Sequence, residues 1–491
     1  MFVAAGCVSS APRTASTSVA TSSSPTTHAP AITTTTVAAS STLASAITVA
    51  ARSVPSSTTS TDPDTTATTA PAKLAPTRTF WLTFGGSADR RSSVAAGPDP
   101  RIAGVRWRSP PLDGLVYGQA LVVDQTVIVA TEGDTVYGLA AADGHVLWSS
   151  NLGQAVRRSS LPCGNIDPTG ITSTPVIDAT GATVYVVSFT QPAHHELVAL
   201  DVASGAVRWR HAIDPPGLSP LVEQQRSALT IANGRVYVAF GGLYGDCGPY
   251  KGAVVSLAAD GSGEVASWIV PTVREGGLWA PSGPAVDAAG NLWAAVGNAA
   301  STSTFDYGNS VVRLTPDLAL VDWWAPKDWA VLSATDADLG SQGPVLLDVG
   351  HVFVAGKAGV GFVLSTTNLG HIGGEVSSRP LCGAAFGGSA SNGSVVVLAC
   401  SVGVTAASVD GGGSLTATWR VGGGRSGPPV IAGPTAWYAS NDGHLRAVDL
   451  TSGQVLSNTV IRSGLEGFPP VTVTTAAVYV GGTNVITAVG A

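Results

Sequence analysis

Val136-Tyr137-Gly138-Leu139, followed by Asp143-Gly144-His145-Val146-Leu147-Trp148, begins a pattern that recurs along most of this chain. A short apolar run leads through an Asp/Gly turn into a second run that ends in tryptophan, which predicts two antiparallel strands joined by a hairpin. We expect the terminal tryptophan to pack against a neighbouring unit. Further copies lie at Leu197–Trp209, Val254–Trp268, Val311–Trp323 and Leu445–Leu456, and a degenerate copy ends at Trp419.

The copies follow one another at intervals of roughly 50 residues, so Trp81–Ala491 holds about eight of them. One four-stranded sheet exposes both faces, whereas a closed ring of such sheets buries them. Gly104–Arg108 is a tryptophan strand without three predecessors, and the segment that ends at Val489 has three strands without a tryptophan strand. We therefore predict an all-β, eight-bladed β-propeller of four-stranded antiparallel blades, in which the N-terminal strand completes the last blade and removes an open edge.

Two other architectures are compatible with parts of this pattern. The repeats around Gly361 and Cys400 are weak, so seven blades are the alternative number. An array of β-sandwiches would also contain many short strands between turns, but it does not explain unpaired strands at both ends of the repeat region.

The N-terminal part of the chain has a different composition from the repeats. Residues 8–78 are rich in Ser, Thr, Ala and Pro and lack aromatic residues, which predicts a disordered linker before a propeller of residues 79–491. Residues 1–7 end in Ala-Ala-Gly-Cys, which resembles the lipobox of bacterial lipoproteins, although a basic region and most of an apolar region are missing before it. We expect Cys7 to be lipidated and to hold the protein outside the cytoplasm, at the cell membrane or cell surface.

Charge and hydropathy exclude several classes of function. The net charge is −7 and no basic cluster occurs, which argues against a nucleic-acid partner. No apolar stretch is long enough to span a membrane, so we expect membrane contact only through the lipid anchor. His194 and His195 lie beside Pro192 without a third ligand nearby, and we interpret them as a surface pair rather than a metal site.

Four cysteines besides Cys7 suit two disulfides in an exported protein. They are Cys163, Cys247, Cys382 and Cys400, and no two of them form a CxxC pair. Four cysteines can pair in three ways. Cys382 and Cys400 fall within one predicted blade, where adjacent strands can bring them together.

The repeats resemble the pyrroloquinoline-quinone (PQQ)-like repeat of quinoprotein alcohol dehydrogenases and of the outer-membrane assembly lipoprotein propeller. Some stretches are similar to exported, mostly uncharacterised bacterial members of this group. They are Cys163-Gly164-Asn165-Ile166, Gly170–Asp178, Gly245–Tyr250, Asp306–Ser310 and Asp338–Pro344. In those members the first block and the Gly245–Tyr250 block each carry a cysteine, so the resemblance implies a Cys163–Cys247 disulfide. Cys382–Cys400 is then the second pair.

The resemblance also implies a candidate cofactor site. Asn298 matches a calcium-binding asparagine, Lys357 matches a basic residue that contacts the quinone, and Asp338 or Asp336 lies near the catalytic aspartate. Asp246 lies near a ligand glutamate but is displaced by one position. No two cysteines are adjacent, so the vicinal disulfide that covers the quinone is absent. In the alternative, purely structural interpretation, Asn298 is a turn residue, Lys357 lies at a hairpin tip, and the aspartates cap backbone amides.

These departures favour a non-catalytic protein. We expect a monomeric, cell-envelope-anchored propeller that binds or scaffolds a protein, peptide or glycan, without a cofactor and without catalytic residues. The alternative is a PQQ- and calcium-dependent oxidoreductase acting on an alcohol or sugar, with Lys357, Asn298 and Asp338 as its cofactor-binding residues.

Overall fold

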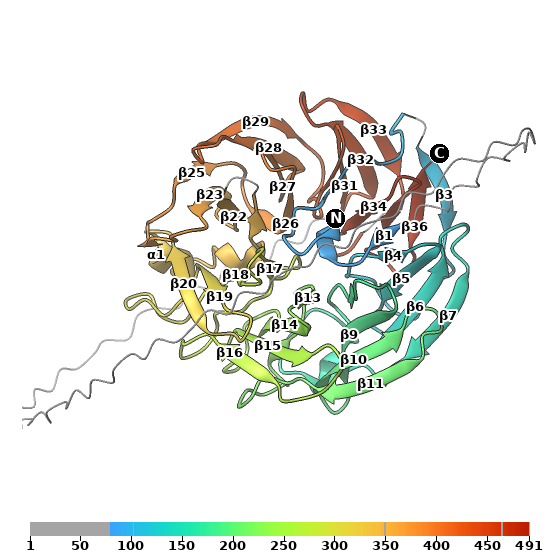
Figure 1. Ribbon diagram of the computed structural model, residues 1–491, viewed down its shortest axis with the longest axis horizontal. Coiled ribbons are helices and arrows are strands. Elements are labelled where there is room, and N and C mark those ends of the chain that lie inside the picture. Colours follow the sequence, from blue (N-terminus) through green and yellow to red (C-terminus); the bar gives the residue numbers. More distant parts are fainter. Residues whose placement is uncertain (1–78, 102, 348–349, 463–464, 491) are drawn as a thin grey trace, which may run out of the picture. The chain divides into compact units, whose positions relative to one another are not determined.

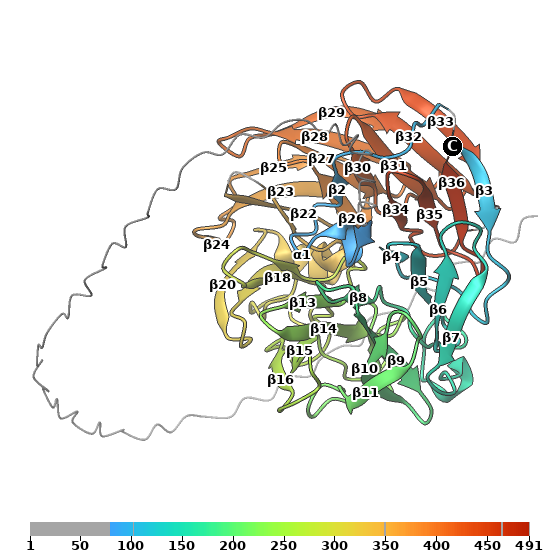
Figure 2. The same cartoon turned by 45° about the vertical axis from the view of Figure 1, so that its right-hand side comes forward.

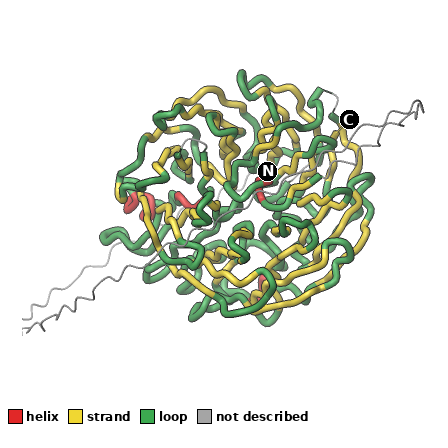
Figure 3. The backbone as a smooth tube through the Cα atoms, viewed as in Figure 1, coloured by secondary structure: helices red, strands yellow, loops and turns green. Residues whose placement is uncertain are grey.

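Eight small antiparallel sheets follow one another around a ring in the computed structural model of the protein (Figure 1). The structure describes residues 79–101, 103–347, 350–462 and 465–490. This is the predicted eight-bladed β-propeller, and both the seven-bladed alternative and the β-sandwich array are wrong. Helical turns are few and lie between strands (Figure 3).

Each blade has four main strands, ordered from the axis outward, and blades 1 to 4 occupy the first half of the ring. Blade 1 is β4 (Leu121–Val123), β5 (Thr126–Ala130), β6 (Thr135–Ala140) and β7 (Val146–Asn151); blade 2 is β8 (Val176–Ile177), β9 (Thr183–Thr190), β10 (His194–Asp201) and β11 (Val207–Ala212); blade 3 is β13 (Thr230–Ala232), β14 (Arg235–Gly242), β15 (Ala253–Ala258) and β16 (Ala266–Ile269); blade 4 is β17 (Ala285–Val286), β18 (Leu292–Val296), β19 (Ser310–Leu314) and β20 (Leu320–Ala325).

Blades 5 to 8 repeat the arrangement. Blade 5 is β21 (Val345–Leu346), β22 (His351–Ala355), β23 (Val360–Ser365) and β25 (Ser377–Pro380); blade 6 is β26 (Ala385–Ser391), β27 (Val395–Cys400), β28 (Val404–Val409) and β29 (Leu415–Val421); blade 7 is β30 (Val430–Ala432), β31 (Thr435–Ser440), β32 (His444–Asp449) and β33 (Val455–Val460); blade 8 is β34 (Val471–Val473), β35 (Val478–Val480), β36 (Thr487–Gly490) and β3 (Gly104–Arg108).

Short additional elements supplement the blades. Strands β1 (Phe80–Trp81), β2 (Ser93–Val94), β12 (Glu223–Gln224) and β24 (His371–Ile372) pair with β4, β30, β14 and β20, respectively; the helical elements are α1 (Trp329–Ala334), η1 (Phe84–Gly86), η2 (Arg158–Ser160) and η3 (Leu339–Ser341). None of the described helices is long and apolar enough to cross a membrane.

The burial of the strands explains why their sequences differ. In blade 1, β4 and almost all of β5 are buried on both faces, whereas β7 alternates between exposed and half-buried residues. An inner strand lies between two neighbouring blades and therefore reads as a continuous apolar run, while an outer strand meets water on one side. The core is thus a set of inter-blade layers around the ring.

Tryptophans of several outer strands join neighbouring blades. The Trp148 indole N–H donates to the carbonyl of Val202 in blade 2 at 3.1 Å. A side chain at Gly205 would collide with this indole, because an added Cβ would lie 2.3 Å from Trp148 Cε3. The same contact joins Trp107 to Ala141 and Gly144, and joins Trp419 to Leu450 and Gly453. The expectation that tryptophan packs against a neighbouring unit is confirmed.

Ring closure uses both ends of the repeat region, as predicted. β3 pairs antiparallel with β36, with Gly104 opposite Gly490 and Arg108 opposite Thr487. Trp107 of β3 then packs on Gly144 of blade 1. The last blade therefore has its outer strand from the N-terminal side and no open edge towards blade 1.

A segment that the repeat pattern does not predict fills the middle of the ring. We call residues 79–95 the plug; they contain β1, η1 and β2 (Figures 1 and 2). β1 and β2 add strands to blades 1 and 7. Plug carbonyls accept backbone amides from blades 2, 4, 5 and 6, in the pairs Leu82–Ile177, Ala88–Val286, Asp89–Leu346 and Arg91–Ser391.

Arg90 anchors the plug in the core. Its side chain is 1% exposed and donates to the carbonyls of Phe84, Leu229 and Pro284 and to the hydroxyls of Thr83 and Thr230. Burial lowers the pKa of Arg90 to about 9, against the opposing charge of Asp89. The guanidinium thus connects the plug to blades 3 and 4, because its hydrogen bonds offset the loss of hydration.

The histidine pair differs from the expectation. His194 is exposed, but His195 is buried, stacks on Phe189 and is held by Asp214, whose carboxylate lies 2.8 Å from its Nδ1. The surface-pair interpretation is wrong for His195, because successive residues of a strand point to opposite faces. Cys7 and the predicted linker, residues 8–78, lie outside the described residues.

Candidate functional site

The two ends of the ring carry different connections. We call one end the upper face; it holds the loops between second and third strands, such as residues 131–134, and the connections between blades, such as residues 161–175. The lower face holds the turns that follow the innermost strands, such as residues 124–125. The plug pairs with the last residues of the innermost strands and therefore lies at the lower face. Loops of the upper face are free to vary without disturbing the blades.

The structure brings the three predicted cofactor residues together on the upper face. Lys357 follows β22, Asn298 follows β18, and Asp338 precedes η3. The Lys357 ammonium lies 2.8 Å from Asp338 Oδ2 and 2.7 Å from Asp336 Oδ1. The Asn298 backbone N–H donates to Asp338 Oδ1 at 2.6 Å, and its side-chain amide donates to Asp336 at 2.9 Å.

Within this lysine–aspartate cluster Asp338 is shielded from water, with 8% of its side chain exposed, whereas Asp336 is 72% exposed. Burial raises the pKa of Asp338, against the lowering effects of Lys357 and of the Asn298 amide. Burial by itself would lower the pKa of Lys357, but the charge of Asp338 and the hydrogen bonds to both aspartates outweigh it, so the pKa is raised. Lys357 is therefore a cation matched to two adjacent carboxyl groups, rather than a free positive charge.

The arrangement does not fit a calcium ion. Calcium takes six to eight oxygen ligands. Both Asp338 oxygens already accept hydrogen bonds, the Asn298 carbonyl accepts the Asn309 amide, and Asp246 accepts the Tyr250 hydroxyl at 2.7 Å. Among the described residues no group of three or more His, Cys, Asp or Glu side chains is placed to hold a metal. The cofactor roles of Lys357, Asn298 and Asp338 stay predictions.

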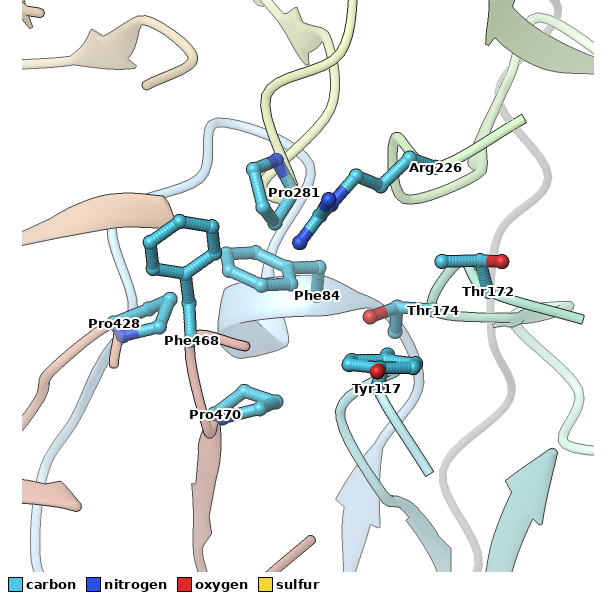
Figure 4. A pocket seen from close by; sticks show the side chains of 9 residues that line it. All are labelled: Phe84, Tyr117, Thr172, Thr174, Arg226, Pro281, Pro428, Phe468 and Pro470. Atoms are coloured by element: carbon cyan, nitrogen blue, oxygen red, sulfur yellow. The ribbon is translucent and has the colours of Figure 1, made fainter. Parts of the chain in front are cut away.

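A shallow depression with room for about one water molecule, a volume of about 10 Å³, lies at the axis of the upper face (Figure 4). Phe84 of the plug lies across the middle of this depression (Figure 4), so the plug reaches through the ring and contributes to its lining. The predicted cofactor residues do not line it. Its lining consists of Phe84, Tyr117, Thr172, Thr174, Arg226, Pro281, Pro428, Phe468 and Pro470.

Two arginines meet at one aromatic ring beside this depression. The Cζ atoms of Arg226 and Arg425 lie 5.4 and 5.3 Å from the centre of the Phe468 ring, which also stacks on Phe386. Burial lowers the pKa of Arg226, and the charge of Arg425 acts in the same direction. Tyr117 adds a phenol whose pKa burial raises to about 12. The lining of the depression thus combines one arginine with aromatic side chains, and Arg425 lies behind it on Phe468.

The sequence patterns that locate the blades did not identify this pocket. Tyr117, Thr174, Arg226 and Phe468 occur at unrelated motifs, but each precedes the innermost strand of its blade. Residues at that repeat position face the axis, so an alignment of the repeats with one another could have grouped them.

Both predicted disulfides are present. Cys163–Cys247 joins the connection between blades 1 and 2 to the upper loop of blade 3, with Cα atoms 6.0 Å apart. Cys382–Cys400 joins the connection that leads into β26 to the last residue of β27, which pairs with Ala385 at the start of β26. The first bond therefore braces loops of the upper face across blades, and the second holds one blade.

A family model described as "Outer membrane protein assembly factor BamB" matches residues 98–246. The match covers less than a third of the chain. Together with the eight blades and the tryptophan contacts, it supports a propeller of the PQQ-like repeat type. The comparison with curated proteins gave no sequence relative.

Solved structures share the fold of this PQQ-like propeller. Quinohemoprotein alcohol dehydrogenase from Comamonas testosteroni has 16% identity and a TM-score of 0.65, over 84% of this chain and 80% of that one. BamB from Moraxella catarrhalis has 17% identity and a TM-score of 0.53, over 79% and 98%. A europium-containing methanol dehydrogenase has 14% identity and a TM-score of 0.61, over 82% and 90%. Identities this low show the fold alone, and the fold occurs in both enzymes and assembly factors.

Proposed function

We propose that this PQQ-like propeller is a non-catalytic binding or scaffolding module of the cell envelope, which engages a protein, peptide or glycan through its upper face. The observation that carries the proposal is the state of Lys357. Its ammonium pairs with Asp336 and Asp338, whereas a quinone-binding residue needs a positive charge directed at its cofactor.

The upper face also carries exposed apolar side chains. Tyr244 (68% exposed), Val273 (78%) and Val402 (67%) all lie in its loops. Loops of this kind, held by a rigid scaffold, commonly carry binding residues. The lower face is occupied by the plug at its centre, so the upper face offers the accessible depression.

An extracytoplasmic location is part of the proposal. Disulfides persist in oxidising compartments, and the two bonds of this chain support such a location. Lipidation of Cys7 would then hold the propeller at the membrane. Replacing Cys7 by serine in the exported protein should move it from the membrane fraction to the soluble fraction, and unchanged membrane association would contradict the anchor.

The second candidate function is a PQQ- and calcium-dependent oxidoreductase, which the convergence of Lys357, Asn298 and Asp338 favours. The test adds the quinone and calcium to the purified full-length protein and records absorbance, melting temperature and dye-coupled oxidation of alcohols and glucose. We expect no spectral shift and no turnover. A shifted spectrum with turnover that Lys357→Met abolishes would replace the scaffold by the enzyme.

A further inference from the structure

The outer strands of blades 2 and 8 contain the same motif, Val-Arg-Trp-Arg, at Val207–Arg210 of β11 and at Val105–Arg108 of β3. The tryptophan of each copy packs on a turn glycine of the next blade, which is Gly261 for β11 and Gly144 for β3. The two pairs of arginines therefore occupy equivalent positions on the outer rim of the ring.

In blade 2 a carboxylate accompanies each arginine of the motif. Arg208 lies 2.7 Å from Asp201, and Arg210 lies 3.3 Å from Glu196. Each guanidinium also donates to a backbone carbonyl of a neighbouring segment. The positive charge of this copy is thus neutralised by the adjacent strand β10.

In blade 8 the equivalent arginines keep the carbonyl contacts but lack carboxylates. Arg106 donates to the carbonyl of Ala476 at 3.2 Å, and Arg108 donates to that of Ile461 at 2.9 Å. Both arginines are exposed, and neither joins an ion pair within the described residues. The same motif therefore leaves two positive charges on the surface of this blade.

The strand pairing shows where the carboxylates were lost. The register of β3 on β36 places Gly490 where β10 has Asp201. It places Val485, two residues before β36, where β10 has Glu196. Glycine and valine carry no charge, so the closing blade lacks both carboxylates while it retains both arginines.

A third arginine extends this positive surface from blade 8 to blade 7. The carbonyl that accepts Arg108 belongs to Ile461, which directly precedes the exposed Arg462. Val460, at the end of β33, is 66% exposed. β33 and β3 follow one another along the outer rim of the ring (Figures 1 and 2). We call Arg106, Arg108, Arg462 and Val460 the rim patch.

Acidic groups do not cancel the charge of the rim patch. Asp442 lies next to Gly443, whose carbonyl accepts the Arg462 amide, but the Asp442 carboxylate is paired with Arg446 at 2.6 Å. The net charge of −7 belongs to the whole chain. Exposed charges more than about 10 Å away are screened at about 0.1 M salt. The rim patch therefore acts on its surroundings as a local positive surface.

The arrangement of the rim patch favours an extended anionic partner. Its three guanidinium groups come from two neighbouring blades and lie on the outward side of the ring. A bilayer with anionic headgroups offers many phosphates in one plane and engages all three groups together, which a single small anion does not. An exposed apolar side chain beside basic residues suits the boundary between headgroups and acyl chains.

We propose that the rim patch rests on the anionic phospholipid headgroups of the membrane to which the propeller is proposed to be anchored. This contact deepens the proposed envelope function, on which it rests, by assigning the side of the propeller that faces the membrane. Each arginine adds about fivefold to the affinity, so the contact is reversible alone and effective beside an acyl anchor. The loops of the upper face stay accessible to a partner.

Co-sedimentation with vesicles tests the rim patch in the full-length protein with Cys7→Ser, to which no acyl chain contributes. The vesicles are phosphatidylcholine alone or an equimolar mixture with phosphatidylglycerol, and inorganic polyphosphate is the soluble anion. We expect the affinity for anionic vesicles to exceed that for neutral vesicles about tenfold or more, and to fall as salt is raised. Equal binding to both vesicles would overturn the membrane contact. Binding to polyphosphate without binding to vesicles would also overturn it, and would identify a soluble polyanion instead.

Two matched double variants assign the contact to blade 8. Arg106→Gln with Arg108→Gln should weaken binding to anionic vesicles about tenfold or more, because glutamine keeps an N–H donor for the backbone carbonyls but has no charge. Arg208→Gln with Arg210→Gln changes the same motif positions in blade 2, where carboxylates neutralise the arginines, and should leave the binding unchanged. Equal weakening by both pairs would overturn the assignment.

A lysine variant distinguishes lost charge from lost structure. Arg106→Lys with Arg108→Lys should retain the binding, because a headgroup surface responds to positive charge and does not require the guanidinium fork. The melting temperature of each variant verifies the fold. Loss of binding in the lysine variant at an unchanged melting temperature would overturn the membrane contact.

Failure of the rim patch and failure of the proposed function give different results. Fractionation of cells that produce the Cys7→Ser protein tests the anchor, because the reversible rim contact is lost on dilution. Absence of vesicle binding would overturn the rim patch and leave an anchored binding module. Quinone-dependent turnover would overturn the non-catalytic role without changing the binding to vesicles.

Discussion

Three buried carboxyl groups of the upper face hold protons near neutral pH. Glu132, Asp134 and Glu223 each accept one backbone N–H, from Gly170, Phe189 and Lys251, respectively. The second oxygen of each has no partner among the described residues. Burial raises their pKa values to about 7, 8 and 8. One hydrogen bond does not compensate for dehydration of a carboxylate, so the protonated form is favoured.

Glu223 therefore makes the stability of the propeller depend on pH. Its pKa is raised from 4.5 to about 8, so the folded state holds the proton more tightly than the unfolded chain. Its contribution to the free energy of unfolding is fully present below pH 4.5. Between pH 4.5 and about pH 8 this contribution is lost at about 1.4 kcal/mol for each pH unit, and above about pH 8 the loss is complete. We therefore expect the melting temperature of Glu223→Gln, relative to that of the wild type, to increase as the pH rises from 5 to about 8. Calorimetry at steps from pH 5 to pH 9 measures this difference.

The exposed Glu264 provides the matched control. Glu264→Gln should follow the wild type at every pH. A difference between Glu223→Gln and the wild type that stays constant from pH 5 to pH 9 would show that Glu223 titrates normally in the fold.

Residues within one motif were easier to predict than residues that meet only in the ring. Lys357, Asn298 and Asp338 were grouped through family-like motifs, and the structure does place them in contact. Arg226 and Arg425 have no motif, and they meet because two distant blades face the same axis. His195 was placed at the surface because its buried neighbours, Phe189 and Phe240, are not recognisable before the strands are paired.

At the scale of the element, the hairpin turn and the tryptophan form one unit across two blades. Gly144 has a positive φ of 78°, and an added Cβ would lie 2.4 Å from Trp107 Cε3. Gly234 also has a positive φ, of 71°, but an added Cβ there meets nothing within 4 Å. Substitutions at the two positions therefore share the backbone strain, and only the one at Gly144 also causes a collision with tryptophan.

We expect Gly144→Ala to destabilise the propeller more than Gly234→Ala, by about 2 kcal/mol beyond the shared cost of a left-handed alanine. The added methyl group would displace Trp107, and with it the strand that closes the ring. Thermal or denaturant unfolding of both variants measures the difference. Equal losses would mean that the Trp107 contact contributes little to closure.

The plug is an element whose role is invisible in its own sequence. β1 and β2 have two residues each, and residues 79–95 have no repeat period. Their backbone groups pair with strands of blades 1 and 7 and with single amides of four other blades. Such a segment adopts its conformation because the ring supplies its partners, and an isolated short strand has no stability of its own.

For the whole molecule, closure links the two ends of the propeller. β3 closes the ring, and Cys163–Cys247 joins residues 84 positions apart, whereas Cys382–Cys400 joins residues 18 positions apart. A cross-link stabilises by restricting the unfolded chain, and it does so more for a longer loop. Loop-closure entropy corresponds to about 4.6 kcal/mol for the longer loop and about 3.2 kcal/mol for the shorter one.

Removing the two bonds separately should therefore have unequal effects. We expect Cys163→Ser with Cys247→Ser to lower the melting temperature more than Cys382→Ser with Cys400→Ser, because the longer loop regains more freedom when unfolded. Scanning calorimetry of both double variants measures the order, and mass spectrometry of the unreduced wild type verifies the pairing. Equal or reversed losses, or other pairs, would contradict the prediction.

The sequence by itself predicted eight blades, with seven as the alternative, and their closure by Gly104–Arg108; its family-like motifs implied both disulfides. These features follow from local periodicity, from strand counting and from family-like motifs, which are properties of short stretches. Only the tertiary structure decided how the axis is filled, which residues line the depression, and that Lys357 is paired with two aspartates. Ring geometry brings residues from distant blades together, and no single repeat encodes its neighbours across the axis.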